Sequence, residues 1–228
     1  MSTVIFDLDG TLAPVGKPIS SAAADGLRRL EAAGHQVAVS SGKPLYYLCG
    51  MLRQVGLKKP ALVGENGAAM QLGIDLPPLL RSTLLYPDHA RVTLQKLRAD
   101  IDRHFGDQVW YQPNEHMLTC FPHEEALFDP IADIIADSNP EQAGLVVYRH
   151  CDCFDIIPCG IDKGAGLEAL CRMLCIEPAD TIAVGDHDND LPMFLKAGMS
   201  IGIGPAAPAA AQYRFDDILS AIDFILTR

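Results

Sequence analysis

The sequence has few basic residues, no long apolar run and no Cys-x-x-Cys pair, and each shortage excludes a class of protein. Lysine and arginine together number 18 against 29 aspartates and glutamates, so the formal net charge is −11 at pH 7. So acidic a chain is a poor candidate for a nucleic-acid partner, because binding the phosphate backbone requires a basic face that displaces counterions. No apolar run reaches the roughly 18 residues of a membrane-spanning helix, so we expect no membrane partner.

The N-terminal residues, MSTVIF, show no basic segment followed by a long apolar one. We therefore expect no secretion signal and a cytoplasmic location. Hydrophobic residues make up 49% of the chain and charged residues 21%, which is typical of a soluble globular enzyme and excludes a disordered chain.

The seven cysteines are odd in number, which in a chain without a secretion signal favours reduced thiols. The segment HCDCFDIIPC at residues 150–159 suggests a zinc site at first sight, but its cysteines alternate along a strand-like run and fit no standard spacing of structural zinc sites. We therefore expect buried thiols that pack as small apolar side chains, with zinc as the less favoured alternative.

Strand-like and helix-like segments alternate at both ends of the chain, which predicts a doubly wound, Rossmann-like parallel α/β sheet. Short apolar runs of the kind buried on both faces indicate the strands, and amphipathic segments with capping residues indicate the helices. The predicted strands are 4–9, 36–42, 60–68, 180–186 and 199–204, and the predicted helices are 20–34, 43–56, 162–176, 189–198 and 216–226.

The pattern changes in the middle of the chain. The sequence predicts helices at 89–105 and 124–138, one or two strands within 109–121, and a strand at 145–158 that breaks near residues 151–155. This composition is typical of an α+β module of about 75 residues. We therefore expect a catalytic core of residues 1–81 and 159–228 with an inserted α+β domain at 82–158 that sets substrate specificity.

Distinctive polar residues follow four of the predicted strands and open one of the helices. In a sheet of this kind, ligands bind where the carboxyl ends of the strands meet. The residues are Asp7, Asp9, Gly10 and Thr11 after the first strand, Ser40, Ser41 and Gly42 after the second, Glu65, Asn66 and Gly67 after the third, Asp186 to Asp190 after the fourth, and Lys163 at the start of a helix.

The pair Asp7 and Asp9 raises a question of charge, because residues two apart in a strand point to the same face. Two neighbouring carboxylates repel each other unless a cation lies between them or one of them turns away at the strand end. Carboxylates from Asp7 and Asp186 would suit Mg²⁺, while Lys163 and a Ser-Gly turn would suit a phosphoryl group. A carboxylate beside Mg²⁺ can attack phosphorus, and a second can move the proton.

Each of these features also has a purely structural explanation. An Asp-x-Asp-Gly segment occurs in turns and calcium loops, although GDHDND at 185–190 lacks the glycine and the closing glutamate of an EF-hand loop. Lys163 alone would be a solvated residue at a helix start. Their combination, in this order and at these strand ends, favours a shared site.

The combination resembles the four ordered motifs of the haloacid dehalogenase (HAD) phosphatase superfamily. The matching segments are DLDGT at 7–11, VAVSSGK at 37–43, Lys163, and GDHDND at 185–190. GENGA at 64–68 and the inserted module are similar to the Cof-like (IIB) branch, which carries an α/β cap at this point. The resemblance implies the HAD core fold, a Mg²⁺ cofactor and a phosphoric monoester hydrolase.

The resemblance also implies a role for each matching residue. Asp7 would be the nucleophile and Asp9 the general acid and base. The metal ligands would be Asp7, Asp186 and the backbone carbonyl of Asp9, and Asp190 and Thr11 would support them. The residues implied to bind the phosphate are Ser41, Gly42, Lys163 and Asn189.

Three positions depart from the family pattern. Ser41-Gly42-Lys43 stands where Thr-Gly-Arg is common, and serine keeps the hydroxyl. Lys43 could add a second cation to the site or be solvated, and we favour solvation. His187 could support the site from behind, but we expect a surface residue. The segment SIGIGPAAP replaces a common Asn-Ala pair, which changes packing behind the site and leaves the chemistry in place.

Residues 82–158 carry 5 lysines and arginines against 13 aspartates and glutamates, and therefore −8 of the net charge. Such a cap repels polyanions and favours a small monophosphate whose remainder is neutral and hydroxylated or mildly cationic. We expect a sugar phosphate or a phosphoglycolate-like acid as substrate, and a monomer or homodimer. The cap residues that could face the substrate are Trp110, Tyr111, Asn114, His116, Arg149 and Asp155.

Two other functions remain open from the sequence. A phosphotransferase similar to phosphomannomutases would return the phosphoryl group to a sugar. A metabolite-binding regulator with an inactive site would perform no chemistry, although all the reactive side chains of the motifs are present.

Overall fold

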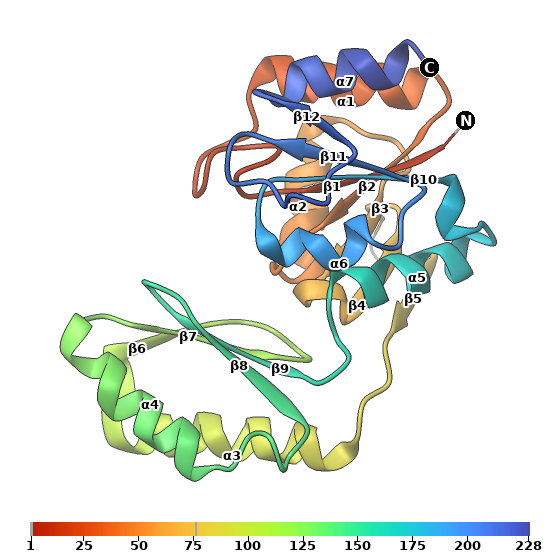
Figure 1. Ribbon diagram of the computed structural model, residues 1–228. Coiled ribbons are helices and arrows are strands. Elements are labelled where there is room, and N and C mark those ends of the chain that lie inside the picture. Colours follow the sequence, from red (N-terminus) through yellow and green to blue (C-terminus); the bar gives the residue numbers. More distant parts are fainter. Residues whose placement is uncertain (1, 76) are drawn as a thin grey trace. The chain divides into compact units, whose positions relative to one another are not determined.

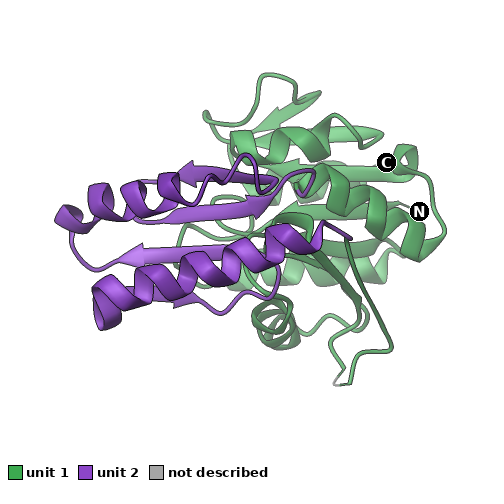
Figure 2. Ribbon diagram, turned by 90° about the horizontal axis from the view of Figure 1, so that it is seen from below, with its two compact units in different colours: residues 1–84, 162–228 green, residues 85–161 purple. Residues whose placement is uncertain are grey.

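The computed structural model describes residues 2–75 and 77–228, which form two compact units (Figures 1 and 2). The core unit runs up to Leu84 and resumes at Asp162, and the insert comprises Leu85–Ile161. Both borders lie three residues beyond those expected from the sequence, at 84 instead of 81 and at 161 instead of 158. The first border moves because Leu80–Thr83 forms a strand of the core sheet.

The core unit is built on an eight-stranded sheet with the order β12-β11-β10-β1-β2-β3-β4-β5. Six neighbouring strands are parallel, and β4 and β5 extend the sheet as antiparallel strands. The parallel strands are β1 (Thr3–Asp7), β2 (Gln36–Ser40), β3 (Ala61–Gly64), β10 (Thr181–Gly185), β11 (Met199–Ile203) and β12 (Tyr213–Phe215), and the antiparallel strands are β4 (Ala69–Leu72) and β5 (Leu80–Thr83).

Helices cover both faces of the core sheet (Figure 1). Strand β1 is buried on both sides, because Val4 and Phe6 pack with the first group of helices and Ile5 packs with the second. This explains its continuous apolar sequence. The first group is α1 (Ser21–Ala32), α2 (Leu45–Val55) and α7 (Ile218–Leu226), and the second is α5 (Lys163–Leu174) and α6 (Leu191–Phe194). The predicted α/β fold class is confirmed.

The insert is a four-stranded antiparallel sheet with the order β6-β7-β9-β8 and two helices on one face. Its hydrophobic core lies between that face and the helices. The strands are β6 (Val109–Gln112), β7 (Leu118–Pro122), β8 (Leu145–Arg149) and β9 (Phe154–Pro158), and the helices are α3 (Asp88–Phe105) and α4 (Phe128–Asp137). The predicted break in the last strand-like segment separates β8 from β9.

The candidate substrate residues of the insert divide between the two faces of its sheet. Tyr111 packs with the helices, and the Arg149 guanidinium lies over the Phe128 and Phe154 rings on that same side. Trp110 and Asp155 alternate with these residues and therefore lie on the opposite face. That face also carries a polar network. In it Asn114 Nδ2 donates to Thr119 Oγ1 at 2.9 Å, Thr119 Oγ1 donates to Asp155 Oδ1 at 2.6 Å, and His150 Nε2 lies 3.5 Å from Asp155 Oδ2.

Two expectations about the cysteines and the membrane can be compared with the structure. Cys49, Cys120, Cys153 and Cys171 are buried as expected, but Cys151, Cys159 and Cys175 are exposed. The correction has a local cause, since these three lie in the bend after β8, just beyond β9 and at the left-handed end of α5. Across the described part of the chain, every helix is too short or too polar to span a membrane.

Candidate active site

Three parallel strands deliver the candidate residues to the carboxyl-terminal edge of the core sheet, where the strands end. Asp7, the last residue of β1, pairs with Ser40 at the end of β2, and Phe6 pairs with Val184 near the end of β10. The residues that follow, Ser41 and Asp186, therefore emerge beside Asp7. Because β1 lies between β2 and β10 and the chain leaves it toward β2, this edge is the topological switch point at which such sheets bind ligands.

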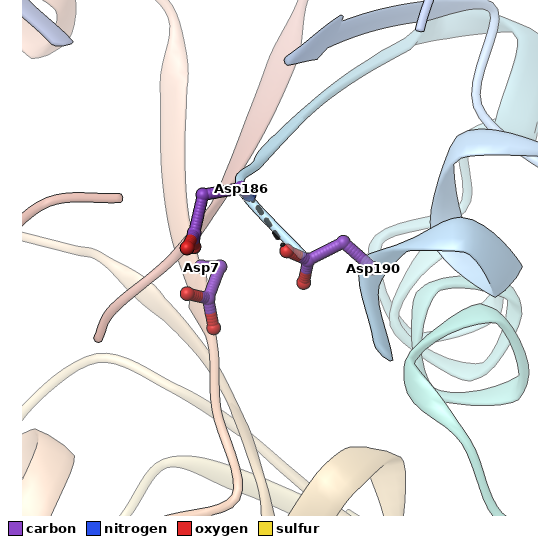
Figure 3. A group of neighbouring side chains, drawn as sticks. All are labelled: Asp7, Asp186 and Asp190. Carbon is purple, nitrogen blue, oxygen red and sulfur yellow. Dashed lines mark hydrogen bonds between the residues drawn. The ribbon is translucent and has the colours of Figure 1, made fainter. Parts of the chain in front are cut away.

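The carboxylates of Asp7, Asp186 and Asp190 converge at this edge (Figure 3). One oxygen from each lies within 4.8 Å of the others. The ammonium of Lys163 joins two of them, since its Nζ donates to Asp7 Oδ1 at 2.5 Å and to Asp190 Oδ1 at 2.6 Å. Lys163 is 2% exposed and Asp190 is fully buried, so these contacts are shielded from water. Water cannot compete for the ammonium here.

Backbone amides also hold the Asp190 carboxylate. Its Oδ2 accepts hydrogen bonds from the amides of Asp186 at 2.9 Å and His187 at 3.1 Å. Both of its oxygens are thus engaged, by Lys163 on one side and by the backbone on the other. Asp190 therefore fixes the position of Asp186 and Lys163 and has little capacity left for a further ligand.

Thr11 and Gly10 hold Asp186 from the other side. Thr11 Oγ1 donates to Asp186 Oδ1 at 2.7 Å. Gly10 has a φ of +97°, and a Cβ at this position would lie 2.2 Å from Asp186 Oδ2. The turn after β1 therefore requires glycine both for its backbone conformation and for the close approach of the Asp186 carboxylate.

The donor set fits a divalent cation. Three carboxylates and one ammonium carry a sum of −3 + 1 = −2 charges in a small volume. Within residues 2–75 and 77–228, no hydrogen-bond donor is directed to Asp7 Oδ2 or Asp186 Oδ2. Oxygen ligands from two carboxylates, completed by water and a phosphate, are what Mg²⁺ prefers in proteins.

Burial changes the acidity of the central pair. Loss of hydration raises the pKa of the Asp7 carboxyl, Lys163 lowers it, and the negative charges of Asp190 and Asp186 raise it again, to about 7 in all. For Lys163, burial favours the neutral amine, but Asp7 and Asp190 outweigh it and the pKa of the ammonium rises. Lys163 is therefore a permanent cation, and a metal ion beside Asp7 would favour its ionised form.

Asp9 does not join the other carboxylates. Its Oδ1 accepts from the amide of Gly16 at 3.3 Å, and its Oδ2 lies 3.9 Å from Lys43 Nζ. The strand ends at Asp7, so the alternation that would place both side chains on one face stops before Asp9. Lys43 is about two-thirds buried along its side chain, so the solvated position favoured from the sequence is corrected, and its ammonium faces Asp9.

Ser41 and Gly42 form the loop after β2. The Ser41 amide donates to Val63 O at 2.9 Å, and the Ser41 hydroxyl accepts from the Lys43 amide at 3.2 Å. Asn66 lies against this loop, since its amide donates to Ser41 O at 3.0 Å. The sequence places Asn66 at a strand end without giving it a role.

The remaining candidates lie on the short turn η5 (Asp188–Asp190). His187 is exposed and caps this turn by accepting from the Asp190 amide. Asn189 is also exposed. Of the residues predicted from sequence, the structure thus brings Asp7, Asp186, Asp190, Lys163 and Thr11 into direct contact, and leaves Asn189 at the rim of the turn.

Comparisons with known proteins agree with this geometry. A family model of haloacid dehalogenase-like hydrolases matches residues 4–76 and 82–214. The chain is 25% identical over 212 residues to a phosphoglycolate phosphatase of Methanoculleus marisnigri, covering 89% of this chain and 84% of the relative. It is 27% identical over 229 residues to an HMP-PP phosphatase of Cronobacter sakazakii, with the same two coverages of 89% and 84%.

Solved structures share the fold over nearly the full length. The crystal structure of TM0651 from Thermotoga maritima gives a TM-score of 0.75 at 19% identity, covering 100% of this chain and 97% of that one. The sugar phosphatase BT4131, of HAD subclass IIB, gives a TM-score of 0.71 at 18% identity and covers 99% of both chains. At these identities the likeness establishes a common architecture.

Proposed function

The chain belongs to the haloacid dehalogenase-like hydrolases, and on this premise we propose that it is a Mg²⁺-dependent phosphatase of a small phosphorylated metabolite. The observation that carries the proposal is the buried Lys163 ammonium, which holds Asp7 beside two further carboxylates at the end of β1. Relatives named phosphoglycolate phosphatase and HMP-PP phosphatase support a small phosphate-ester substrate.

Asp7 is the nucleophile in this proposal. Lys163 holds Oδ1, and Oδ2 attacks phosphorus, so that an oxygen–phosphorus bond forms on Asp7 while the bond to the ester oxygen breaks. Ser41, the Gly42 amide, Lys163 and Asn189 bind the phosphate oxygens. The buried position of Asp7 supports this role, because a carboxylate with little hydration is a stronger nucleophile.

Asp9 moves the proton. It donates a proton to the leaving oxygen and then accepts one from the water that attacks the aspartyl-phosphate and frees Asp7. Its carboxylate lies with Gly16 and Lys43, so it must rotate toward the leaving group for this step. The contacts at 3.3 Å and 3.9 Å are long, and such a rotation breaks no strong hydrogen bond.

Mg²⁺ would be held by the carboxylates of Asp7 and Asp186 and the backbone carbonyl of Asp9. When bound, it would reduce the repulsion between the phosphate and the Asp7 carboxylate and fix their mutual orientation. Thr11 and Asp190 support this site by fixing Asp186.

The insert favours a substrate with a neutral or mildly cationic organic part. Its 5 basic and 13 acidic side chains, 5 − 13 = −8 over residues 82–158, repel a second anionic group on the substrate. A sugar phosphate therefore fits better than a phosphoglycolate-like acid. A panel of phosphorylated metabolites should show the highest kcat/KM for hydroxylated monophosphates, and a preference for carboxylated ones would contradict this part of the proposal.

The test of the proposed function uses p-nitrophenyl phosphate. The wild type should release phosphate in the presence of Mg²⁺, and Asp7→Asn should abolish it. Asp188→Asn is the matched control, because Asp188 is an exposed carboxylate two residues from Asp186. Undiminished turnover in Asp7→Asn would refute the proposal. With a hexose 1-phosphate, free sugar and phosphate are expected, whereas a hexose 6-phosphate would identify a phosphotransferase.

A further inference from the structure

The turn after β3 takes a backbone conformation that its residues ordinarily resist. Glu65, Asn66 and Gly67 have φ values of +53°, +54° and +110°. Two further non-glycine residues of the described chain have positive φ, Asn139 and Cys175, and both follow helices, where a left-handed residue is an ordinary ending. Glu65 and Asn66 follow a strand, and Glu65 is 2% exposed. Their conformation therefore needs another explanation.

One side of this turn contacts the loop after β2. The Glu65 amide donates to Lys43 O and the Asn66 amide donates to Ser41 O, both at 3.0 Å. A Cβ at Gly42 would lie 3.3 Å from Asn66 Nδ2, so the Asn66 side chain rests on the Gly42 backbone. The left-handed conformation turns these groups back toward the loop.

The other side of the turn contacts the start of α5. A Cβ at Gly67 would lie 2.1 Å from Asp162 O and 3.1 Å from the Gly166 amide nitrogen. A Cβ at Gly166 would in turn lie 2.6 Å from Gly67 Cα. The two backbones therefore touch directly, immediately beside Lys163, the first residue of α5.

We propose that Glu65–Gly67 is a positioning element that sets the distance between the Ser41–Gly42 loop and the Lys163 ammonium. This inference rests on the proposed function, in which these two groups bind the same phosphate. Asn66 holds the Gly42 backbone from one side, and Gly67 holds the first turn of α5 from the other. Three successive residues with positive φ allow both contacts at once, which accounts for the strained conformation at Glu65 and Asn66.

Two variants and a control test the positioning role. Asn66→Gly keeps the left-handed backbone accessible and removes the amide from Gly42, whereas Gly67→Ala places a methyl group against Asp162 O. Gly73→Ala is the control, because Gly73 also has positive φ, +80°, but the nearest atom to its added Cβ is 4.0 Å away. Gly73→Ala therefore has the conformational cost of an alanine at positive φ without a steric clash.

The readouts separate positioning from folding. For Asn66→Gly we expect the KM of p-nitrophenyl phosphate and the inhibition constant of inorganic phosphate to rise about tenfold. For Gly67→Ala we expect kcat/KM to fall about 100-fold, since a displacement of about 1 Å has effects of that size. Gly73→Ala should match the wild type. Should Gly67→Ala fail to fold, Asn66→Gly decides alone. Unchanged inhibition by inorganic phosphate in Asn66→Gly would overturn the inference.

A measurement without catalysis keeps this test independent of the proposed function. Amide hydrogen exchange of residues 41–45 should be faster in both turn variants than in the wild type and in Gly73→Ala. If the wild type hydrolyses no phosphate ester, the proposed function fails while exchange still reports on the turn. If the wild type is active but exchange and phosphate inhibition are unchanged in the variants, the positioning role fails and the function stands.

Discussion

Replacing Lys163 with methionine tests the charge arrangement of the site most directly. Methionine has a similar length and fills the buried space, but it removes the ammonium that Asp7 and Asp190 share at 2.5 and 2.6 Å. Removing one partner of a buried ion pair typically costs about 3–5 kcal/mol, because the other charge stays buried without compensation. We expect Lys163→Met to lose about this much stability at pH 8.

The loss should be smaller at pH 5. Burial raises the pKa of Asp7 from 3.8 to about 7, so the carboxyl is protonated at pH 5. A neutral carboxyl is attracted less strongly to the ammonium, so removing the ammonium costs less stability. An acid whose pKa is higher in the folded than in the unfolded chain destabilises the fold as the pH rises from the lower value to the higher one. Without Lys163 the pKa of Asp7 rises further, so the variant should keep losing stability above pH 7.

The assay is urea unfolding without metal at pH 5 and pH 8, followed by circular dichroism. Circular dichroism is chosen because tryptophan fluorescence would report on the insert, where the single tryptophan, Trp110, lies, and not on the core that contains Lys163. Lys196→Met is the matched control, because its ammonium pairs with Glu168 at 2.7 Å but is 49% exposed. We expect a much smaller loss of stability from this surface pair, because solvent screens its charges. Equal losses for Lys163→Met at both pH values, or a loss no larger than that of the control, would refute the reasoning.

Three further predictions concern residues around this site and in the insert. Asp9→Asn should leave Mg²⁺ binding in place and lower kcat by about 10²–10⁴-fold, as steady-state kinetics and a metal titration would show. Thr11→Val removes the 2.7 Å hydrogen bond to Asp186 and should weaken Mg²⁺ about tenfold in calorimetric titration, whereas unchanged affinity would exclude a supporting role. In the insert, the hydrogen bond to Asp155 raises the pKa of His150 above 6.5, so an NMR titration should find it lowered in Asp155→Asn. The contribution of His150 to stability should be present below pH 6.5 and disappear as the pH rises through the raised pKa, and it should be small because the ring is half exposed.

The sequence predicts most of the core because local signals and long-range packing agree there. The apolar run of β1 and the serine before α1 mark their elements plainly, and Ser20 Oγ does accept from the Ala23 amide at the start of α1. Asp162 caps α5 in the same way through the Ala165 amide, which fixes Lys163 as the first helical residue. Such signals depend on neighbours in the chain, so the sequence alone contains them.

The elements that the sequence does not predict are three short strands of the core sheet: β4, which lies inside the sheet, and β5 and β12 at its two edges. Strand β5 reads LRST and is exposed along its whole length, and β12 has only three residues. Strand β5 has no apolar face and forms only because β4 offers its free edge. In β12, Tyr213 and Phe215 pack against the core, but three residues are too short an alternation to predict a strand. Helix α6 spans only Leu191–Phe194 of the predicted 189–198. It begins later because the Asp190 carboxylate accepts from the amides of Asp186 and His187 and holds these residues in a turn before the helix.

The position of Asp9 shows why motif spacing does not fix geometry. Residues two apart share a face only while the strand continues, and β1 ends at Asp7. Gly10, at φ +97°, then reverses the chain, and Asp9 meets Gly16 and Lys43, the latter 34 residues away (43 − 9). The repulsion expected between Asp7 and Asp9 is avoided by separation, and the carboxylates that do approach Asp7 come from Asp186 and Asp190.

The charged groups of the site come from distant parts of the chain, which links the site to completion of the sheet. Asp7 precedes the insert, and its partner Lys163 follows 156 residues later. The shared contact of Lys163 with Asp7 and Asp190 can form only once β10 has paired with β1, because that pairing brings Asp190 to the same edge. Two carboxylates that repel one another, those of Asp7 and Asp190, are then bridged by one ammonium. The Asp7–Lys163–Asp190 arrangement therefore stabilises only the closed sheet, and its loss in Lys163→Met should speed unfolding more than it slows folding.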